Sequence, residues 1–162
     1  MVLWLIILIV LVAIDQFSKL WVVSFFVAEG DTLPIIDGFF HFTYSRNPGA
    51  VFGIGGDHGF ALIFFIGVFI VAIGVFGFLF LKNDFQDPKK RLYTIALTLL
   101  IAGAFGNTID RIFQFDHRVV DFIDFRGIWP YIFNVADMCL TLGLIAFMVD
   151  TFFIEPKRRV KS

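Results

Sequence analysis

The chain has 162 residues, of which 59% are hydrophobic and 24 are phenylalanine, and its mean hydropathy is +0.87. A soluble domain of this length cannot bury so much apolar surface, so the composition predicts an integral membrane protein. The formal net charge of −1, without a basic stripe, gives no reason to expect nucleic-acid binding. Because Cys139 is the single cysteine and the three histidines are scattered, we expect no disulfide, metal or other cofactor.

Four apolar runs are long enough to cross a bilayer, which takes about 20 helical residues. They cover residues 2–27, 60–81, 92–113 and 131–154. The first run lacks a basic leading segment and a small-residue cleavage site, and it is longer than a signal peptide, so we interpret it as a retained span. The predicted fold class is an all-α membrane protein with four transmembrane helices in a single domain, residues 1–162.

Lysine and arginine gather in the link between the second and third spans and in the C-terminal tail. They are Lys82, Lys89, Lys90 and Arg91 in the link, and Lys157, Arg158, Arg159 and Lys161 in the tail. By the positive-inside rule, both termini and this link are cytoplasmic. The segments 28–59 and 114–130 then face outward.

Glycine and proline interrupt segment 28–59 repeatedly, so this segment is not a helix. Between the breakers, the aromatic run 39–44 favours a strand, which predicts a small β-rich extracytoplasmic subdomain at the membrane interface. Asn47-Pro48-Gly49 suits a tight turn that frees the Asn47 side chain for binding, although a plain loop turn has the same pattern. We expect segment 28–59 to form a mobile cover that is hinged at its glycines.

Two aspartates bracket the start of the fourth span: Asp121, within residues 119–124, and Asp137, within residues 133–137. A carboxylate in hydrocarbon is costly, so an acid there is a functional hypothesis. Asp137 falls about two turns inside the predicted span, and both acids belong to its outer face. Two acids that converge can share one proton and activate water. Asp124 competes with Asp121, because the two lie on opposite faces if 119–124 is extended.

Further polar residues recur at helical spacing beside these acids. Asp15 and Lys19 are four apart on one face of the first span. Lys19 either snorkels to the interface or forms an ion pair that stabilises packing and orients its neighbours. Asn134 lies three residues before Asp137 and can bind substrate or steer the carboxylate.

The outer end of the third span carries Asn107, Asp110 and Arg111 on one face. We expect these residues to form a polar shelf under the acids, an Asp–Arg pair that ends the helix, or both at once. Gly103 and Gly106 allow a neighbouring helix to approach closely there.

Together, in chain order, these motifs resemble the lipoprotein signal peptidases of bacteria, also called signal peptidase II. The matching pieces are 15–19, 47–52, 106–111, 119–123 and 133–137, which span almost the whole chain. The resemblance implies a four-helix aspartyl endopeptidase of the bacterial inner membrane, with cytoplasmic termini and an active site at the outer face. It places the catalytic pair on Asp121 and Asp137. Its supporting or substrate-binding positions fall on Asn47, Asn107, Asp110, Arg111, Asn134, Asp15 and Lys19.

The resemblance also implies the substrate, a prolipoprotein whose cysteine carries a diacylglyceryl group and which is cut just before that cysteine. We expect membrane lipid as a further contact and a monomeric protein. Three other interpretations stay open. One is a small transporter or channel with an acidic ion path, and another is an assembly subunit in which ion pairs only join helices. The third is a presenilin-like protease, although residues 53–57 do not meet its Gly-x-Gly-Asp signature.

Overall fold

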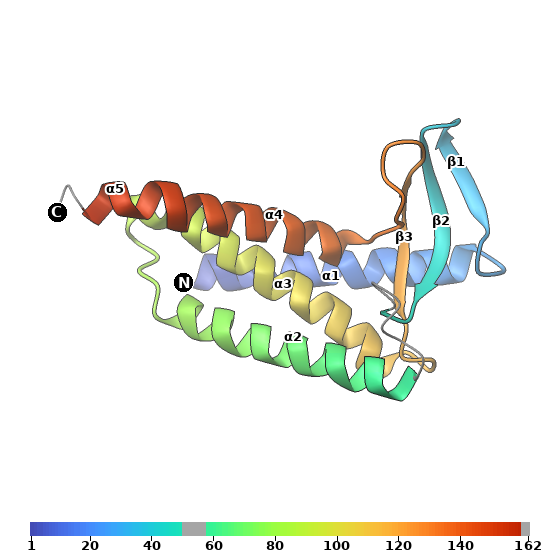
Figure 1. Cartoon of the computed structure of the whole chain (residues 1–162), viewed down its shortest axis with the longest axis horizontal. Coiled ribbons are helices and arrows are strands. Elements are labelled where there is room, and N and C mark those ends of the chain that lie inside the picture. The colour runs from blue at the N-terminus through green and yellow to red at the C-terminus, as the bar shows by residue number, and fades with distance from the viewer. Residues whose placement is uncertain (50–57, 160–162) are drawn as a thin grey trace.

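The structure, a computed structural model, describes residues 1–49 and 58–159. Four long helices form a bundle, and a three-stranded sheet stands at one end of it (Figure 1). The helices are α1 Val2–Phe25, α2 His58–Leu81, α3 Arg91–Phe113 and α4 Val135–Val149; a π-helical turn, Asp150–Ile154, and α5 Glu155–Arg159 continue α4. All four are long and apolar enough to cross a membrane. The fold class predicted from composition and pattern is therefore confirmed.

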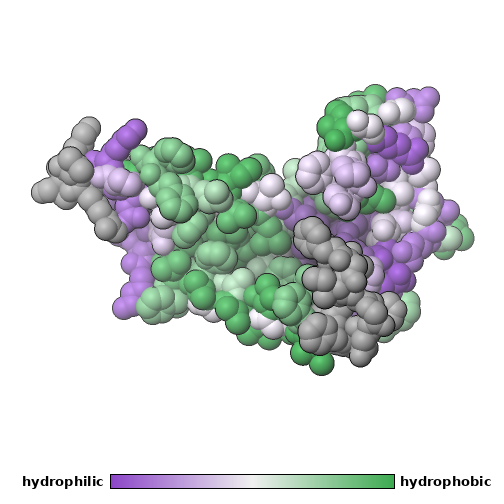
Figure 2. All heavy atoms as spheres, viewed as in Figure 1, coloured by the Kyte–Doolittle hydropathy of each residue, from purple (hydrophilic) through white to green (hydrophobic). Residues whose placement is uncertain are grey.

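Helix α3 is the most buried of the four and packs against α1, α2 and α4. Its two outer glycines make this approach possible. A Cβ added to Gly103 would lie 2.4 Å from the carbonyl oxygen of Ala136, and one added to Gly106 would lie 2.5 Å from Asp15 Oδ2. Close contact at small residues stabilises helix association in lipid, where no hydrophobic drive acts between helices. The other helices expose apolar side chains along the bundle, which Figure 2 shows in green.

The sheet consists of β1 Thr32–Ile36, β2 Phe40–Asn47 and β3 Val119–Phe125, antiparallel and in the order β1-β2-β3. Most of the aromatic run that favours a strand lies in β2. The third strand comes from the segment after α3, and its register sets Ser45 opposite Asp121. An apolar core that includes Val22 and Phe122 joins the sheet to the end of α1. The sheet therefore holds the ends of β2 and β3 above the helix bundle.

The N-terminus, α5 and the link between α2 and α3 lie at the end of the bundle away from the sheet (Figure 1). Successive long helices run in opposite directions along the bundle, so a chain with four of them begins and ends on the same side. The basic residues of the link and of α5 are at this end, and the sheet is at the other.

The fourth helix starts later than the apolar run predicts, at Val135 and not at residue 131. Phe133 instead forms a bridge to Ile123 with backbone hydrogen bonds of 2.8 and 3.1 Å, and Asn134 then caps the helix. The prediction that Asp137 lies two turns inside the helix is therefore wrong. Asp137 is in the first turn, because hydropathy cannot distinguish an apolar strand-like segment from the helix that follows it.

Candidate active site

Asp121 lies on β3 with only 2% of its surface exposed, and it faces a pocket of about 990 Å³ below the sheet. The competing acid, Asp124, does not line this pocket. It accepts a hydrogen bond of 2.7 Å from Thr43 and pairs with Arg126 at 3.2 Å. Because β3 is extended, the two acids point to opposite faces of the sheet. The register of β3 thus brings Asp121, and not Asp124, to the pocket.

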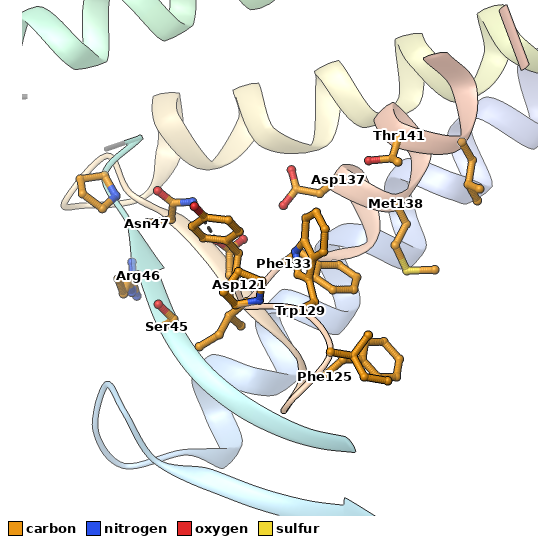
Figure 3. A pocket seen from close by; sticks show the side chains of 16 residues that line it. Ser45, Arg46, Asn47, Asp121, Phe125, Trp129, Phe133, Asp137, Met138 and Thr141 are labelled. Carbon is orange, nitrogen blue, oxygen red and sulfur yellow. Dashed lines mark hydrogen bonds between the residues drawn. The ribbon is translucent and has the colours of Figure 1, made fainter. Parts of the chain in front are cut away.

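Asp137 reaches the same pocket from the first turn of α4 (Figure 3). The Asn134 side chain accepts a hydrogen bond of 2.9 Å from the Asp137 backbone nitrogen, and Asp137 Oδ2 accepts one of 3.3 Å from the Asn134 nitrogen. These reciprocal bonds form a capping box. The cap fixes the Asp137 carboxylate at the mouth of the helix, where the helix dipole favours negative charge.

Asn134 contacts both acids. Its Nδ2 donates a hydrogen bond of 2.6 Å to Asp121 Oδ1, while its backbone nitrogen bonds Asp137. Asn134 is fully buried, so these bonds are shielded from water. One residue therefore brings the two carboxylates of β3 and α4 together at the edge of one pocket.

Two further asparagines direct their amide nitrogens at the acids. Asn47 Oδ1 accepts a hydrogen bond of 2.8 Å from the Gly49 nitrogen, so its Nδ2 donates to Asp121 Oδ2 at 2.9 Å. Asn107 Nδ2 donates to Asp137 Oδ1 at 2.7 Å. With the bonds from Asn134, every carboxylate oxygen of Asp121 and Asp137 accepts an N–H. The Asn47 turn is thus more than a plain loop turn, since its side chain contacts a pocket acid.

A buried charge cluster lies directly behind these amides. Lys19 is 1% exposed, and its Nζ lies 2.8 Å from Asp15 Oδ2, 3.1 Å from Asp110 Oδ2 and 3.2 Å from Asn107 Oδ1. All three ammonium protons therefore have acceptors. Lys19 does not snorkel, and the alternative of an ion pair inside the bundle is the one that the structure shows.

The two acids of this cluster also hold backbone close to the pocket. Asp15 Oδ1 accepts a hydrogen bond of 2.8 Å from the Ala136 nitrogen, and Asp110 Oδ2 accepts one of 3.1 Å from the Val120 nitrogen. Each carboxylate thus binds the residue immediately before a pocket acid. The cluster ties β3 and α4 to α1 and α3.

The pKa of Asp121 is raised to about 7, first by burial and then by the negative charge of Asp137. The N–H donors of Asn47 and Asn134 and the charge of Lys19 act in the opposite direction, because they favour the ionised form. A carboxyl with this pKa holds or releases a proton near neutral pH. That property suits an acid that takes part in proton transfer.

A family described as signal peptidase (SPase) II matches residues 7–153. The chain belongs to this family. Two relatives named lipoprotein signal peptidase extend the match. That of Fusobacterium nucleatum is 42% identical over 94% of this chain and 87% of the relative, and that of Clostridioides difficile is 38% identical over 97% and 99%.

Two solved structures of bacterial membrane enzymes share the fold of this chain. One is described as a bacterial membrane enzyme determined by the in meso method at 1.9 Å resolution. It shares 31% sequence identity and a TM-score of 0.79, and the match covers 94% of each chain. The second, at 2.3 Å resolution, shares 32% identity with a TM-score of 0.78 over 94% of this chain and 91% of that chain. The chain is therefore a multi-pass membrane protease of the signal peptidase II family.

Arg111, the remaining predicted site residue, lies beside the pocket acids without an ion pair among the described residues. Its guanidinium lies over the rings of Phe65 and Phe69, at 5.1 and 5.4 Å from the ring centres, and donates a hydrogen bond of 3.3 Å to the Asn107 carbonyl. The ion pair of Asp110 is with Lys19. The expected Asp–Arg pair at the helix end is therefore wrong, and the polar shelf describes this part of the structure better.

Several residues in the buried polar network and around the pocket were not among the predicted site residues. Gln16 donates hydrogen bonds to Asp110 Oδ1 and the Gly106 carbonyl, and Arg46 pairs with Asp116 at 2.8 Å beside the pocket. The pocket wall also contains aromatic residues from the end of β3 to the start of α4, which were not singled out from the sequence. They are Phe125, Trp129, Tyr131 and Phe133.

The predicted mobile cover spans segment 28–59. The structure describes this segment up to residue 49, where it forms β1 and β2, and its mobility stays a prediction. Residues 50–57, on which the comparison with the presenilin-like signature that ends at Asp57 depends, lie outside the described residues. Within the described ranges, no group of three or more His, Cys, Asp or Glu side chains could hold a metal ion. Cys139 is buried on α4 as a free thiol.

Proposed function

We propose that this chain is a membrane aspartyl endopeptidase that removes the signal peptide from diacylglyceryl-modified prolipoproteins, cutting before the lipidated cysteine. The observation that carries the proposal is the contact of Asn134 with both Asp121 and Asp137 at the edge of one pocket. Two carboxylates in this relationship are the groups that an aspartyl protease needs. Membership of the signal peptidase II family supports the substrate class.

In the proposed reaction, a water molecule attacks the carbonyl carbon of the scissile peptide. One carboxylate is ionised and takes a proton from the water, while the other carboxyl is protonated and donates to the carbonyl oxygen. The resulting tetrahedral intermediate collapses when a proton passes to the leaving amine. Two close carboxyls in a low-dielectric site hold one proton between them, because a second negative charge there is costly. The raised pKa of Asp121 supports this sharing.

The asparagines keep the two carboxylates in position for that exchange. Each donates an N–H to a carboxylate oxygen and is fixed at its own oxygen by another donor: the Gly49 nitrogen for Asn47, Lys19 for Asn107 and the Asp137 nitrogen for Asn134. A carboxylate oxygen has two lone pairs, so one N–H per oxygen leaves a second lone pair for water or for the shared proton. The amides therefore orient the acids without blocking them.

The apolar wall of the pocket is consistent with a substrate that carries a lipid. Met138 and Leu142 on α4 and Phe133 before it give the pocket an apolar side that runs from the acids along the helix. Each buried methylene of an acyl chain is worth about 0.8 kcal/mol, so even a short stretch of lipid would contribute substantially to binding. A peptide bond at headgroup depth with its lipid on the membrane side fits this layout.

The proposed location is the bacterial cytoplasmic membrane, with both termini in the cytoplasm, the acids at the outer face and the protein acting as a monomer. The basic link and tail at the end away from the sheet support this orientation by the positive-inside rule. An ion-conducting protein is the weaker alternative. The described acids of the buried network gather near the sheet, where Asp15 and Asp110 share the single cation Lys19, and they do not form a path across the bundle.

The experiment that tests the proposal uses purified protein in detergent with two forms of one precursor, with and without the diacylglyceryl group on cysteine. We expect release of the signal peptide, with the new N-terminus at the lipidated cysteine, and a much slower reaction on the unmodified form. Release at equal rates would contradict the lipid requirement. No release from the modified precursor, together with ion flux in vesicles, would favour the transporter.

A further inference from the structure

The pocket continues from the two acids along the exposed side of α4, where one polar side chain interrupts an apolar wall. Figure 3 shows Thr141 beyond Asp137 on the helix, with its hydroxyl oxygen on the side toward Asp137. Met138 and Leu142 line the pocket beside it. Thr141 is thus a hydroxyl in a part of the wall that is otherwise hydrophobic and lies within a candidate membrane span.

The Thr141 hydroxyl forms no hydrogen bond with the described residues, in contrast to threonines on α3. Thr98 donates to the Thr94 carbonyl at 2.8 Å, and Thr108 donates to the Ala104 carbonyl at 2.7 Å. The hydroxyl of a threonine in a helix can form this hydrogen bond to the backbone carbonyl one turn earlier. An unpartnered hydroxyl in an apolar wall can instead donate to a ligand, and a hydroxyl in hydrocarbon without any partner is costly.

We propose that the Thr141 hydroxyl donates a hydrogen bond to an ester carbonyl of the diacylglyceryl group on the substrate cysteine. This inference rests on the proposed function. Thr141 is four residues, or about one helical turn, beyond Asp137, a rise of about 6 Å along the helix. The nearer ester carbonyl of a diacylglyceryl cysteine is about seven covalent bonds from the nitrogen of the scissile peptide, a path long enough to span one turn of α4. With that peptide at the acids, the ester can therefore reach Thr141.

The surroundings of Thr141 suit an ester better than a charged headgroup. A neutral hydroxyl is a suitable donor to a neutral carbonyl, and the α4 wall contributes no cation to the pocket. The acyl chains that begin at the ester would continue over Met138 and Leu142, which are 42% and 54% exposed. Thr141 would therefore bind the ester group of the lipid, while the apolar surface of α4 binds the acyl chains.

The test compares an ester-linked diacylglyceryl precursor with an ether-linked dialkylglyceryl precursor of the same chain length, which lacks the carbonyl acceptor. Steady-state kinetics with the wild-type protein should give a kcat/KM about three- to tenfold higher for the ester, which corresponds to one net hydrogen bond. Thr141→Val, which has nearly the same shape, should lose this preference because only its rate on the ester falls. Thr141→Ser, which keeps a hydroxyl, should retain the preference.

The matched control is Thr98→Val, which removes a helical hydroxyl that bonds its own helix. It should leave the ester preference unchanged. Equal rates of the wild type on ester and ether, or an equal loss on both with Thr141→Val, would overturn the proposed ester contact while cleavage itself continues. If the wild type cleaves neither precursor, the proposed function fails, and this inference fails with it.

Discussion

The ammonium of Lys19 donates a hydrogen bond of 3.2 Å to Oδ1 of Asn107. Because the amide oxygen is engaged in this way, the amide nitrogen is turned to Asp137 Oδ1, at 2.7 Å. An inverted amide would set its oxygen against a carboxylate and its nitrogen against an ammonium, and both contacts are repulsive. A buried cation on α1 therefore fixes which group of Asn107 faces a pocket acid on α4.

Replacing either proposed catalytic acid by asparagine should abolish cleavage. Asp121→Asn and Asp137→Asn keep the shape of the side chain but cannot exchange a proton, so kcat should fall by at least roughly 100-fold. The rate of signal-peptide release measures this, with thermal unfolding as a check on folding. Asp124→Asn is the control, since Asp124 bonds Thr43 and Arg126 outside the pocket. If Asp124→Asn were inactive while Asp121→Asn remained active, the catalytic role would belong to Asp124.

Activity should fall at alkaline pH with an apparent pKa near 7, because the protonated carboxyl is lost as pH rises through the pKa of Asp121, which is raised to about 7. Asn47→Ala should move this alkaline decrease in activity to higher pH, because loss of the N–H that favours the ionised form raises the pKa of Asp121 further. A pH profile of kcat/KM measures both. A decrease that stays in place after Asn47→Ala would contradict the role of Asn47 in setting the acidity of Asp121.

The same pKa shift has a consequence for stability. The pKa of Asp121 is higher in the folded protein than in the unfolded chain, so the folded state binds more protons between about pH 4 and pH 7. The contribution of this group is complete below about pH 4 and is lost as pH rises to about 7. Unfolding of Asp121→Asn should therefore depend less on pH in this window than unfolding of the wild type.

Lys19→Met should destabilise the protein by about 3–5 kcal/mol, because it leaves Asp15 and Asp110 as buried carboxylates without their cation. Denaturant or thermal unfolding in detergent measures the change in the free energy of unfolding. Lys89→Met, at an exposed lysine near the start of α3, is the matched control and should change it by less than about 0.5 kcal/mol. Similar small effects of both substitutions would mean that the buried cluster contributes little to stability.

Gly106→Ala should reduce both stability and activity. The new Cβ would lie 2.5 Å from Asp15 Oδ2 and 2.8 Å from the Ala136 Cβ, so α1 or α4 has to move. Gly77→Ala on α2 is the control: its Cβ would meet nothing within 4 Å, and alanine favours a helix over glycine by about 1 kcal/mol. Thermal unfolding should show opposite signs for the two changes. A neutral Gly106→Ala would mean that the helix contact is looser than the structure shows.

The parts of the fold that depend on summed local signals could be predicted from the sequence. Apolar runs give the helices, and the aromatic residues of 39–44 give most of β2. The beginning of α4 could not be predicted in this way, because residues 131–133 are as apolar as the helix itself and only their pairing with Ile123 keeps them out of it.

The candidate site was likewise predictable from the sequence only in part. The residue types that form it are visible in the sequence, because polar side chains in apolar spans are rare. Their partners are not visible. The choice of Asp121 over Asp124 depends on which face of β3 meets the pocket, and the pairing of Asp110 with Lys19 and not with Arg111 depends on contact between α1 and α3. Such choices are made by tertiary structure and leave no trace in spacing along the chain.

The sheet order has a consequence for biosynthesis. Strand β2 is made before α2, but its partner β3 emerges only after α3, and Asn134 and Asp137 follow later still. Contacts between segments so distant in sequence form late. A nascent chain therefore lacks both proposed catalytic acids until most of it has been translated and three helices have entered the membrane. The proposed active site is therefore completed only when α4 has been made. Shorter nascent fragments lack Asp137, so we expect them to be inactive toward other proteins at the site of membrane insertion.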